Sequence, residues 1–518
     1  MEDIFIPNLL TYSLPFVMHA HVFYGVRYAD PPVGAYRWKP PRPVSPWSGV
    51  YDASFPRPAC MQVCSGSSEC PKKVSEDCLY LNIFVPLELN FTSPLWRPLP
   101  VMVWIHGGDF IAGSASKPLF DGRFISNFTR TVVVNVEYRL GAFGFLVSGK
   151  DPLSSATGNY GILDQQAALF WVQQNIAAFG GDPSKVTVFG ESAGAQSVSL
   201  HLTIHSSRPL FKQAVLQSLP FSIPLKSRLR PLFSKALFQI TMVFCPFAGS
   251  KVVNPFRFLE VFETWGPHID GELIKEQAIT AFQKGDWQKE KALLLGETTA
   301  AANTNVLLFF PPASYWTPTA PRCGEITYLR PFYFSFQIIT DYVFLCPSRR
   351  SARDGTTAGS HVWMYVFDHV ASDRSVWSGL TFCYEHVCHG AELPFLFDSA
   401  PVANYSLTLP EKLLSNRMLC YWGAFAHTGD PSSRVEQTVF CREQRLPMFL
   451  SITPSLTVSV ITCCSDFYYF FPHWLKLNQT KHVLFLGQLG LPDLFPLAKC
   501  SWKNCFKGQY CVFSSTIK

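Results

Sequence analysis

The sequence has little net charge, no dense run of Lys or Arg and no internal repeat. Its 43 basic and 37 acidic residues among 518 give a formal net charge of +6. That balance does not indicate a nucleic-acid surface, so charge identifies no partner. Without repeats or long low-complexity tracts the chain is predicted to be globular, and 48% apolar residues can bury one large core.

The first residues do not have the pattern of a secretory leader. Met1-Glu2-Asp3 is acidic, and Pro7 and Pro15 interrupt the apolar stretch that ends at Val17. We therefore treat residues 1–22 as an atypical N-terminal segment.

Cysteine usage nevertheless favours an oxidising compartment. Sixteen cysteines would be unusual in a cytosolic enzyme. Four N-x-S/T sequons lie at Asn90, Asn127, Asn404 and Asn478. Together they predict a secreted glycoprotein.

A long apolar stretch lies near the C-terminus. Residues 448–471 contain a single charge, Asp466, and are long enough to cross a bilayer. Pro454 and several Ser and Thr residues argue against a membrane span. We expect no membrane contact, and assign residues 448–472 to an apolar insertion and 473–518 to the C-terminal remainder of the domain.

The most informative motif is the pentapeptide Gly190-Glu191-Ser192-Ala193-Gly194. It lies between a β-branched and aromatic run, Val186–Phe189, and apolar residues at helical spacing over Ala195–Leu202. A tight strand-to-helix turn would expose the Ser192 hydroxyl at the carboxyl edge of a sheet, and the two glycines leave room for it. The motif predicts Ser192 as a nucleophile.

A longer stretch around this motif resembles the type B carboxylesterase and cholinesterase family. The resemblance rests on Gly158–Gln166, Gly180-Gly181-Asp182-Pro183 and Val186–Gly194, and extends over about residues 24–431. It implies an α/β-hydrolase fold, with a large mixed, mostly parallel sheet covered by helices on both faces, in a domain over residues 23–447. It also implies a small-molecule ester substrate, no cofactor, and a Cys60–Cys78 disulfide, with a Cys64–Cys70 bridge nested inside as a hypothesis.

Serine acyl transfer also needs donors for the tetrahedral oxyanion. Residues 100–105 are predicted to form a buried strand that ends in His106-Gly107-Gly108-Asp109. The resemblance implies that the backbone amides of Gly108, Asp109 and Ala193 form the oxyanion hole. Relatives commonly have glycine where this chain has Asp109. We expect its carboxylate to face away, because a negative charge pointing inward would oppose the oxyanion.

The general base is expected after the strand predicted at residues 361–367. There the resemblance places the catalytic imidazole at His389, with His386 as the alternative. Cys383, His386, Cys388 and His389 could also be interpreted as a metal cluster. Their spacing fits no common zinc pattern, so we expect no metal.

The acid of the triad is where the resemblance fails. Relatives have a glutamate five residues after the glycine that ends a buried strand, here Ala292–Gly296, and Ala301 occupies that position. Glu297 is the nearest candidate, or else a solvated loop residue. Glu191 and Ser218 match buried polar positions that support the triad in relatives. Loss of the orienting anion costs a serine protease ~10⁴-fold in turnover.

The sequence therefore predicts a serine hydrolase that acts on carboxylic esters through an acyl-enzyme, with turnover weakened by the missing acid at Ala301. The alternative is a catalytically impaired cholinesterase-like module for binding or adhesion. A third interpretation is a product that folds poorly, suggested by the unusual start, the gap at Ala301 and the apolar insertion.

Overall fold

The computed structural model describes residues 20–62, 71–89, 91, 97–227, 265–299, 340–377, 379–433 and 441. The expectations for Ala301, the Cys64–Cys70 bridge, Asn90, Asn478 and residues 448–518 lie outside these ranges. Among the described residues, no helix is both long enough and apolar enough to cross a bilayer.

The core of the fold is an eight-stranded sheet in the order β1-β4-β6-β5-β7-β8-β11-β12. Its strands are β1 (Ala20–Arg27), β4 (Tyr80–Pro86), β5 (Leu99–Ile105), β6 (Val132–Val136), β7 (Gly181–Glu191), β8 (Gln213–Gln217), β11 (Ala292–Thr298) and β12 (Val362–Phe367). Strands β1 and β4 pair antiparallel, as do β4 and β6, and the other neighbours are parallel. The predicted mixed, mostly parallel sheet is confirmed.

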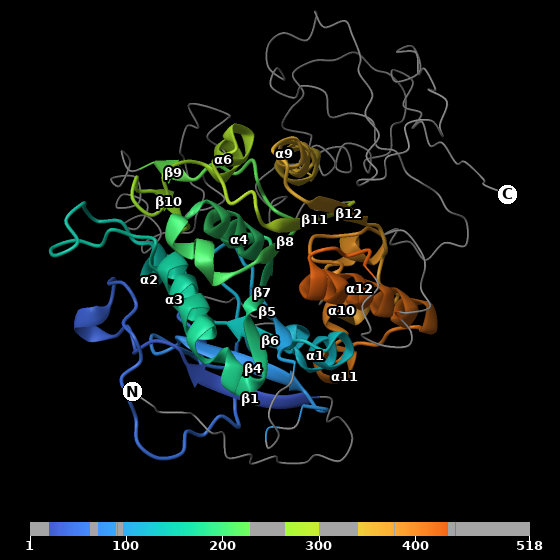
Figure 1. Ribbon diagram of the computed structural model, residues 1–518, viewed down its shortest axis with the longest axis horizontal. Coiled ribbons are helices and arrows are strands. Elements are labelled where there is room, and N and C mark those ends of the chain that lie inside the picture. Colours follow the sequence, from blue (N-terminus) through green and yellow to red (C-terminus); the bar gives the residue numbers. More distant parts are fainter. Residues whose placement is uncertain are drawn as a thin grey trace, which may run out of the picture. The chain divides into compact units, whose positions relative to one another are not determined.

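Helices cover both faces of this sheet (Figure 1). They are α1 (Arg123–Thr129), α2 (Gly141–Phe145), α3 (Tyr160–Asn175), α4 (Ala193–Thr203), α6 (Ala278–Lys284), α9 (Cys346–Thr357), α10 (Leu393–Phe397), α11 (Ala400–Ala403) and α12 (Leu409–Thr428). Helices α3 and α4 lie on one side of the sheet, and α1, α10 and α12 lie on the other. Because both faces are covered, the central strands are apolar throughout rather than alternating.

The central strands are buried along most of their length. Five consecutive residues of β6 and all residues of β5 after Leu99 are buried. In β7 the predicted run Val186–Phe189 lies inside a longer strand that begins at Gly181. Helix α3 precedes this strand and is followed by a 3₁₀ turn over Ile176–Phe179.

Two small two-stranded sheets accompany the large one. They pair β2 (Ala59–Cys60) with β3 (Val74–Ser75) and β9 (Lys226–Ser227) with β10 (His268–Ile269). A disulfide joins Cys60 to Cys78, as the resemblance implies, with Cα atoms 4.9 Å apart.

The strands that carry the site residues are neighbours in the sheet. Strand β5 ends directly before His106, and β7 ends at Glu191. The parallel strands β8 and β11 end directly before Ser218 and at Thr298. Their register pairs Glu191 with Gln217 and Gly296 with Gln217. The carboxyl edge of a parallel sheet collects such residues at one place, and this fold does so here.

Candidate functional site

Ser192 occupies a strained turn between β7 and α4. Its backbone has φ 58° and ψ −124°, which a non-glycine residue adopts only when its surroundings impose it. A Cβ at Gly194 would collide with the carbonyl oxygen of Ile105, so helix α4 can approach β5 only with glycine there. The turn is further fixed by a hydrogen bond from the Ser192 amide to the Gln217 carbonyl, at 3.0 Å. This is the nucleophile-elbow geometry that the pentapeptide predicts.

The loop after β5 packs directly against this turn. A Cβ at Gly107 would lie 3.0 Å from the Cβ of Ser192. The His106 ring contacts the Gly107 carbonyl through Nδ1 at 2.9 Å, and the Tyr138 hydroxyl donates to the His106 carbonyl at 2.8 Å. The carbonyl groups of His106 and Gly107 are therefore both held in place, and this restricts the direction of the backbone amides of Gly108 and Asp109.

Asp109 lies in this loop with φ 52°. Its side chain is accessible to solvent although protein surrounds most of it, and this environment raises the pKa of the carboxyl group. The carboxyl also lies within electrostatic reach of His389 and Glu191. A charge on Asp109 would therefore act on His389, and the raised pKa disfavours that charge; the expectation that this carboxylate faces away from the oxyanion stays a prediction.

The structure brings His389 to the nucleophile turn. Its Nε2 lies 2.9 Å from Oε1 of Glu191, the residue that precedes Ser192, and its side chain is only 11% exposed. Burial by itself lowers the pKa of His389, but Glu191, Glu392 and Asp109 raise it, and the outcome is a pKa of about 9. At neutral pH this imidazole is therefore mainly the imidazolium.

The contact between His389 and Glu191 replaces the expected contact with the nucleophile. No hydrogen bond joins the Ser192 hydroxyl to His389 among the described residues. Catalytic hydrogen bonds often form only when substrate is bound, so this arrangement does not exclude the base role.

Glu297 lies at the end of strand β11 and is 1% exposed, so it is not the solvated loop residue of the alternative interpretation. Ser348 donates a hydrogen bond to its Oε1 at 2.5 Å, and its Oε2 is buried with no partner among the described residues. Burial raises its pKa well above the ordinary value, although Ser348 and the charge of His389 act in the opposite direction. Burial therefore disfavours the charged form of Glu297.

Sequence reasoning missed a further carboxylate, Glu392. It follows His389 by three residues, and the Gln217 side chain donates to its Oε1 at 3.1 Å. Burial and the charge of Glu191 raise its pKa to about 7. The spacing His389 to Glu392 was visible in the sequence, but nothing in it indicated that both side chains would be buried together.

Ser218, the other supporting residue, is fully buried with φ 48°. Its amide donates to the Gly296 carbonyl at 2.6 Å. Ala193 begins helix α4 and is 2% exposed. Both residues lie where the resemblance implies, beside the nucleophile turn.

The metal interpretation of the histidine segment is wrong. Cys383 and Cys388 are joined in a disulfide, so neither sulfur is free to bind a metal. His386, the alternative base, packs its ring on Phe382 with centroids 4.2 Å apart. No group of three or more His, Cys, Asp or Glu side chains in the described ranges could hold a metal ion.

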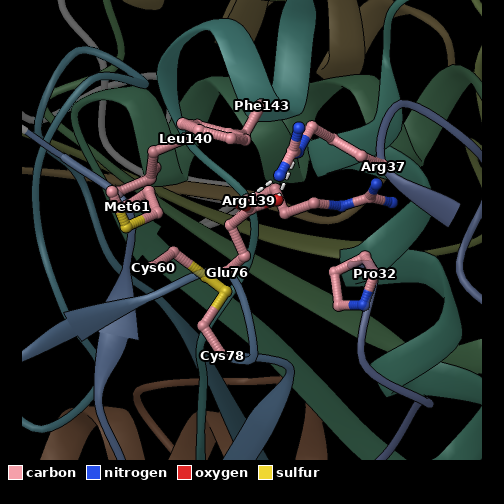
Figure 2. Close-up of a pocket in the computed structure, with 9 residues that line it drawn as sticks. All are labelled: Pro32, Arg37, Cys60, Met61, Glu76, Cys78, Arg139, Leu140 and Phe143. Carbon is pink, nitrogen blue, oxygen red and sulfur yellow. Dashed lines mark hydrogen bonds and ion pairs between the residues drawn. A yellow bond between two sulfur atoms is a disulfide. The ribbon is translucent and has the colours of Figure 1, made fainter. Parts of the chain in front are cut away.

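Two cavities lie away from this site. Figure 2 shows the smaller one beside the Cys60–Cys78 disulfide and the Arg37–Glu76 ion pair. Its volume of about 10 Å³ suits one water molecule and excludes an ester. The larger, of about 490 Å³, is lined by Pro183, Lys212 and Lys291, at the opposite ends of β7, β8 and β11 from Ser192.

Comparisons with known proteins identify the family of this chain. The family model described as "Carboxylesterase family" matches residues 13–315 and 333–459. The chain belongs to this family. Acetylcholinesterase from Bungarus fasciatus is 35% identical over 494 residues, covering 82% of this chain and 78% of the relative. The cholinesterase of Mus musculus is 30% identical, covering 88% of this chain and 84% of the relative.

Carboxylesterase-family relatives of this chain also include a protein not named for an enzymatic activity. The "Crystal protein" of Dictyostelium discoideum is 33% identical and covers 79% of both chains. Family membership therefore supports an ester hydrolase without establishing that this chain is active.

Proposed function

We propose that the chain hydrolyses small-molecule carboxylic esters, with Ser192 as nucleophile and His389 as base. The observation that carries this proposal is the meeting of three segments distant in sequence. Glu191 contacts His389, and the Gly107 backbone packs against Ser192. This arrangement supplies a nucleophile, a base and backbone amides at one point, which acyl transfer requires.

In the first step the Ser192 hydroxyl oxygen attacks the ester carbonyl carbon while Nε2 of His389 takes the proton. The oxyanion accepts hydrogen bonds from the amides of Gly108, Asp109 and Ala193. The alcohol then leaves with the proton from His389. Water, deprotonated by the same imidazole, hydrolyses the acyl-enzyme and restores Ser192. For these reaction steps the His389 ring must turn so that its Nε2 points away from Glu191 and toward Ser192.

Glu297 is the carboxyl group that we propose in place of the missing triad acid. Two features support it: its charge would interact with that of His389, and Nδ1 of His389 and Oε2 of Glu297 are both buried without a described partner. Because burial raises the pKa of Glu297 and so disfavours its charged form, it supports His389 less than a fully ionised triad acid would. We therefore expect a slow esterase at neutral pH.

The alternative, a binding or adhesion module, draws support from the same observations. An imidazolium paired with Glu191 and an acidic side chain at position 109 both oppose catalysis. Retention of the strained turn at Ser192 favours the enzyme, because a binding module has no need of that strain.

A fluorophosphonate probe separates the two functions. We expect the purified full-length chain to be labelled covalently, and Ser192→Ala to abolish the label while the circular dichroism spectrum is unchanged. Ser199→Ala is the matched control, because it removes a buried hydroxyl further along helix α4, where Ser199 donates to the Gln196 carbonyl, and it should still be labelled. Absence of label on the folded wild-type chain at millimolar probe and pH 9 would support the binding module.

Secretion and glycosylation remain part of the proposal. Asn127 and Asn404 are exposed, and the Cys60–Cys78, Cys383–Cys388 and Cys420–Cys441 disulfides fit an oxidising compartment. A peptide N-glycosidase digest of the chain expressed in a secretory pathway should lower its apparent mass. An unchanged mass would contradict the glycoprotein assignment.

A further inference from the structure

The Cys383–Cys388 disulfide ends at the residue directly before His389. Its cysteines are 1% and 3% exposed, so the bridge is an interior element and not a surface staple. It closes a loop of only five residues in sequence separation, and the 3₁₀ turn Thr381–Tyr384 leads into this loop, with the Cys383 amide donating to the Leu380 carbonyl at 3.0 Å.

The chain around His389 has little regular structure on one side. Between the end of β12 at Phe367 and His389, the described residues form only two 3₁₀ turns, at Arg374–Trp377 and Thr381–Tyr384. On the other side the chain enters α10, and the Ala391 amide donates to the Cys388 carbonyl at 3.0 Å. On the N-terminal side of His389, after β12, the described residues form no strand, so the disulfide is the covalent link that restrains the backbone there.

Side-chain contacts hold the His389 ring only at one nitrogen. Its Nε2 pairs with Glu191, but Nδ1 is buried and has no partner among the described residues. Phe344 packs beside the ring, with centroids 5.1 Å apart. In a complete triad a carboxylate at Nδ1 would fix the ring, and that contact is not seen here.

We propose that the Cys383–Cys388 disulfide is a positioning element for His389, which fixes the backbone of the base where no carboxylate of the described residues contacts Nδ1 of its ring. This inference rests on the proposed esterase function. Its chemical basis is that a short covalent loop removes backbone freedom directly before the base, while misplacement of a catalytic group by about 1 Å can cost ~10²-fold in rate.

The test is a double-mutant cycle with Cys383→Ser, Cys388→Ser and the double variant. Removal of either cysteine breaks the same bridge, so we expect all three variants to lose kcat to the same degree, about 10- to 100-fold, with KM little changed. The control is Cys420→Ser/Cys441→Ser, which removes a disulfide that does not flank a site residue. Active-site titration corrects for any fraction that fails to fold.

A second readout does not depend on activity. We expect the pKa of His389, followed by NMR of labelled histidine and assigned with His389→Asn, to fall in all three variants. The carboxyl groups that face the ring are Glu191 of β7, Asp109 of the oxyanion loop, Glu297 of β11 and Glu392. A ring released from its position loses the contact with Glu191 first, and a purely structural bridge would leave this pKa unchanged.

The outcomes separate the two proposals. If the wild-type chain is never labelled by fluorophosphonate but the pKa falls as expected, the esterase proposal fails and the positioning of His389 stands. If Cys388→Ser loses activity while Cys383→Ser keeps it, residue 388 matters and the bridge does not. Wild-type kcat and an unchanged pKa in the double variant would overturn the inference.

Discussion

The esterase activity should rise steeply with pH, because His389 must lose a proton before it can act as a base. With a pKa of about 9, only about 1% of the imidazole is neutral at pH 7, and half is neutral at pH 9. Measured kcat/KM should therefore increase about 50-fold between these two values. A histidine at its ordinary pKa of about 6.5 would give an increase of only about 1.3-fold.

The charge at Glu191 is the main cause of this behaviour, so Glu191→Gln should move the inflection to lower pH. The variant should have a larger neutral fraction at pH 7 and a smaller ratio of kcat/KM between pH 9 and pH 7. The assay is hydrolysis of a fluorogenic short-chain ester at substrate concentrations below KM, with Ser192→Ala measured in parallel for background. A wild-type inflection near pH 6.5, or an identical profile for Glu191→Gln, would refute the reasoning.

The same pair affects the free energy of unfolding. The pKa of His389 is higher in the folded chain than in the unfolded one, so its contribution is fully present below about pH 6.5. It is lost as pH rises through about 9, and a difference of about 2.5 pKa units corresponds to about 3 kcal/mol. Denaturant unfolding at pH 6.5 and pH 9 should show this loss in the wild-type chain and a smaller one in Glu191→Gln.

Three further predictions concern single residues. Asp109→Gly should raise kcat, because it removes a carboxyl group near the site and glycine readily adopts the φ of 52°, and steady-state kinetics at pH 8 will measure the change. Glu297→Gln should lower kcat/KM by a factor that grows as pH rises, because burial raises the pKa of Glu297 and the wild-type carboxyl ionises increasingly at higher pH. Gly194→Ala should lower the free energy of unfolding by about 3 kcal/mol in urea titrations, because its Cβ would collide with the Ile105 backbone.

Each of these has a clear contrary result. Lower kcat in Asp109→Gly would mean that the carboxyl assists the reaction. A Glu297→Gln profile that matches the wild type at every pH would exclude Glu297 as the acid. For Gly194→Ala, a stability equal to that of the wild-type chain would show that α4 and β5 do not approach as described.

Much of the fold could be predicted because its signals are local. The pentapeptide around Ser192 and the apolar runs that became β5, β7, β11 and β12 each specify a strand or a turn within about ten residues. The boundaries were less accurate, as with the early start of β7 at Gly181, because hydrogen bonding to β5 extends that strand past its apolar run.

The site could be predicted only in part. Ser192, His389 and the oxyanion loop followed from motifs and from family resemblance. The pairing of Cys383 with Cys388 and the burial of Glu392 could not, since sequence spacing does not show which of sixteen cysteines are joined or which carboxyl groups are buried.

The sequence by itself determined that a serine would be held in a strained turn at the edge of a parallel sheet, because glycine spacing and strand composition act over short distances. Only the tertiary structure decided which acid faces His389. Glu191, Glu297 and Glu392 come from separate segments of the chain, and burial together with neighbouring charges raises the pKa of Glu297 and of Glu392. The charge of the base, and with it the pH at which the chain can act, is therefore a property of the folded molecule.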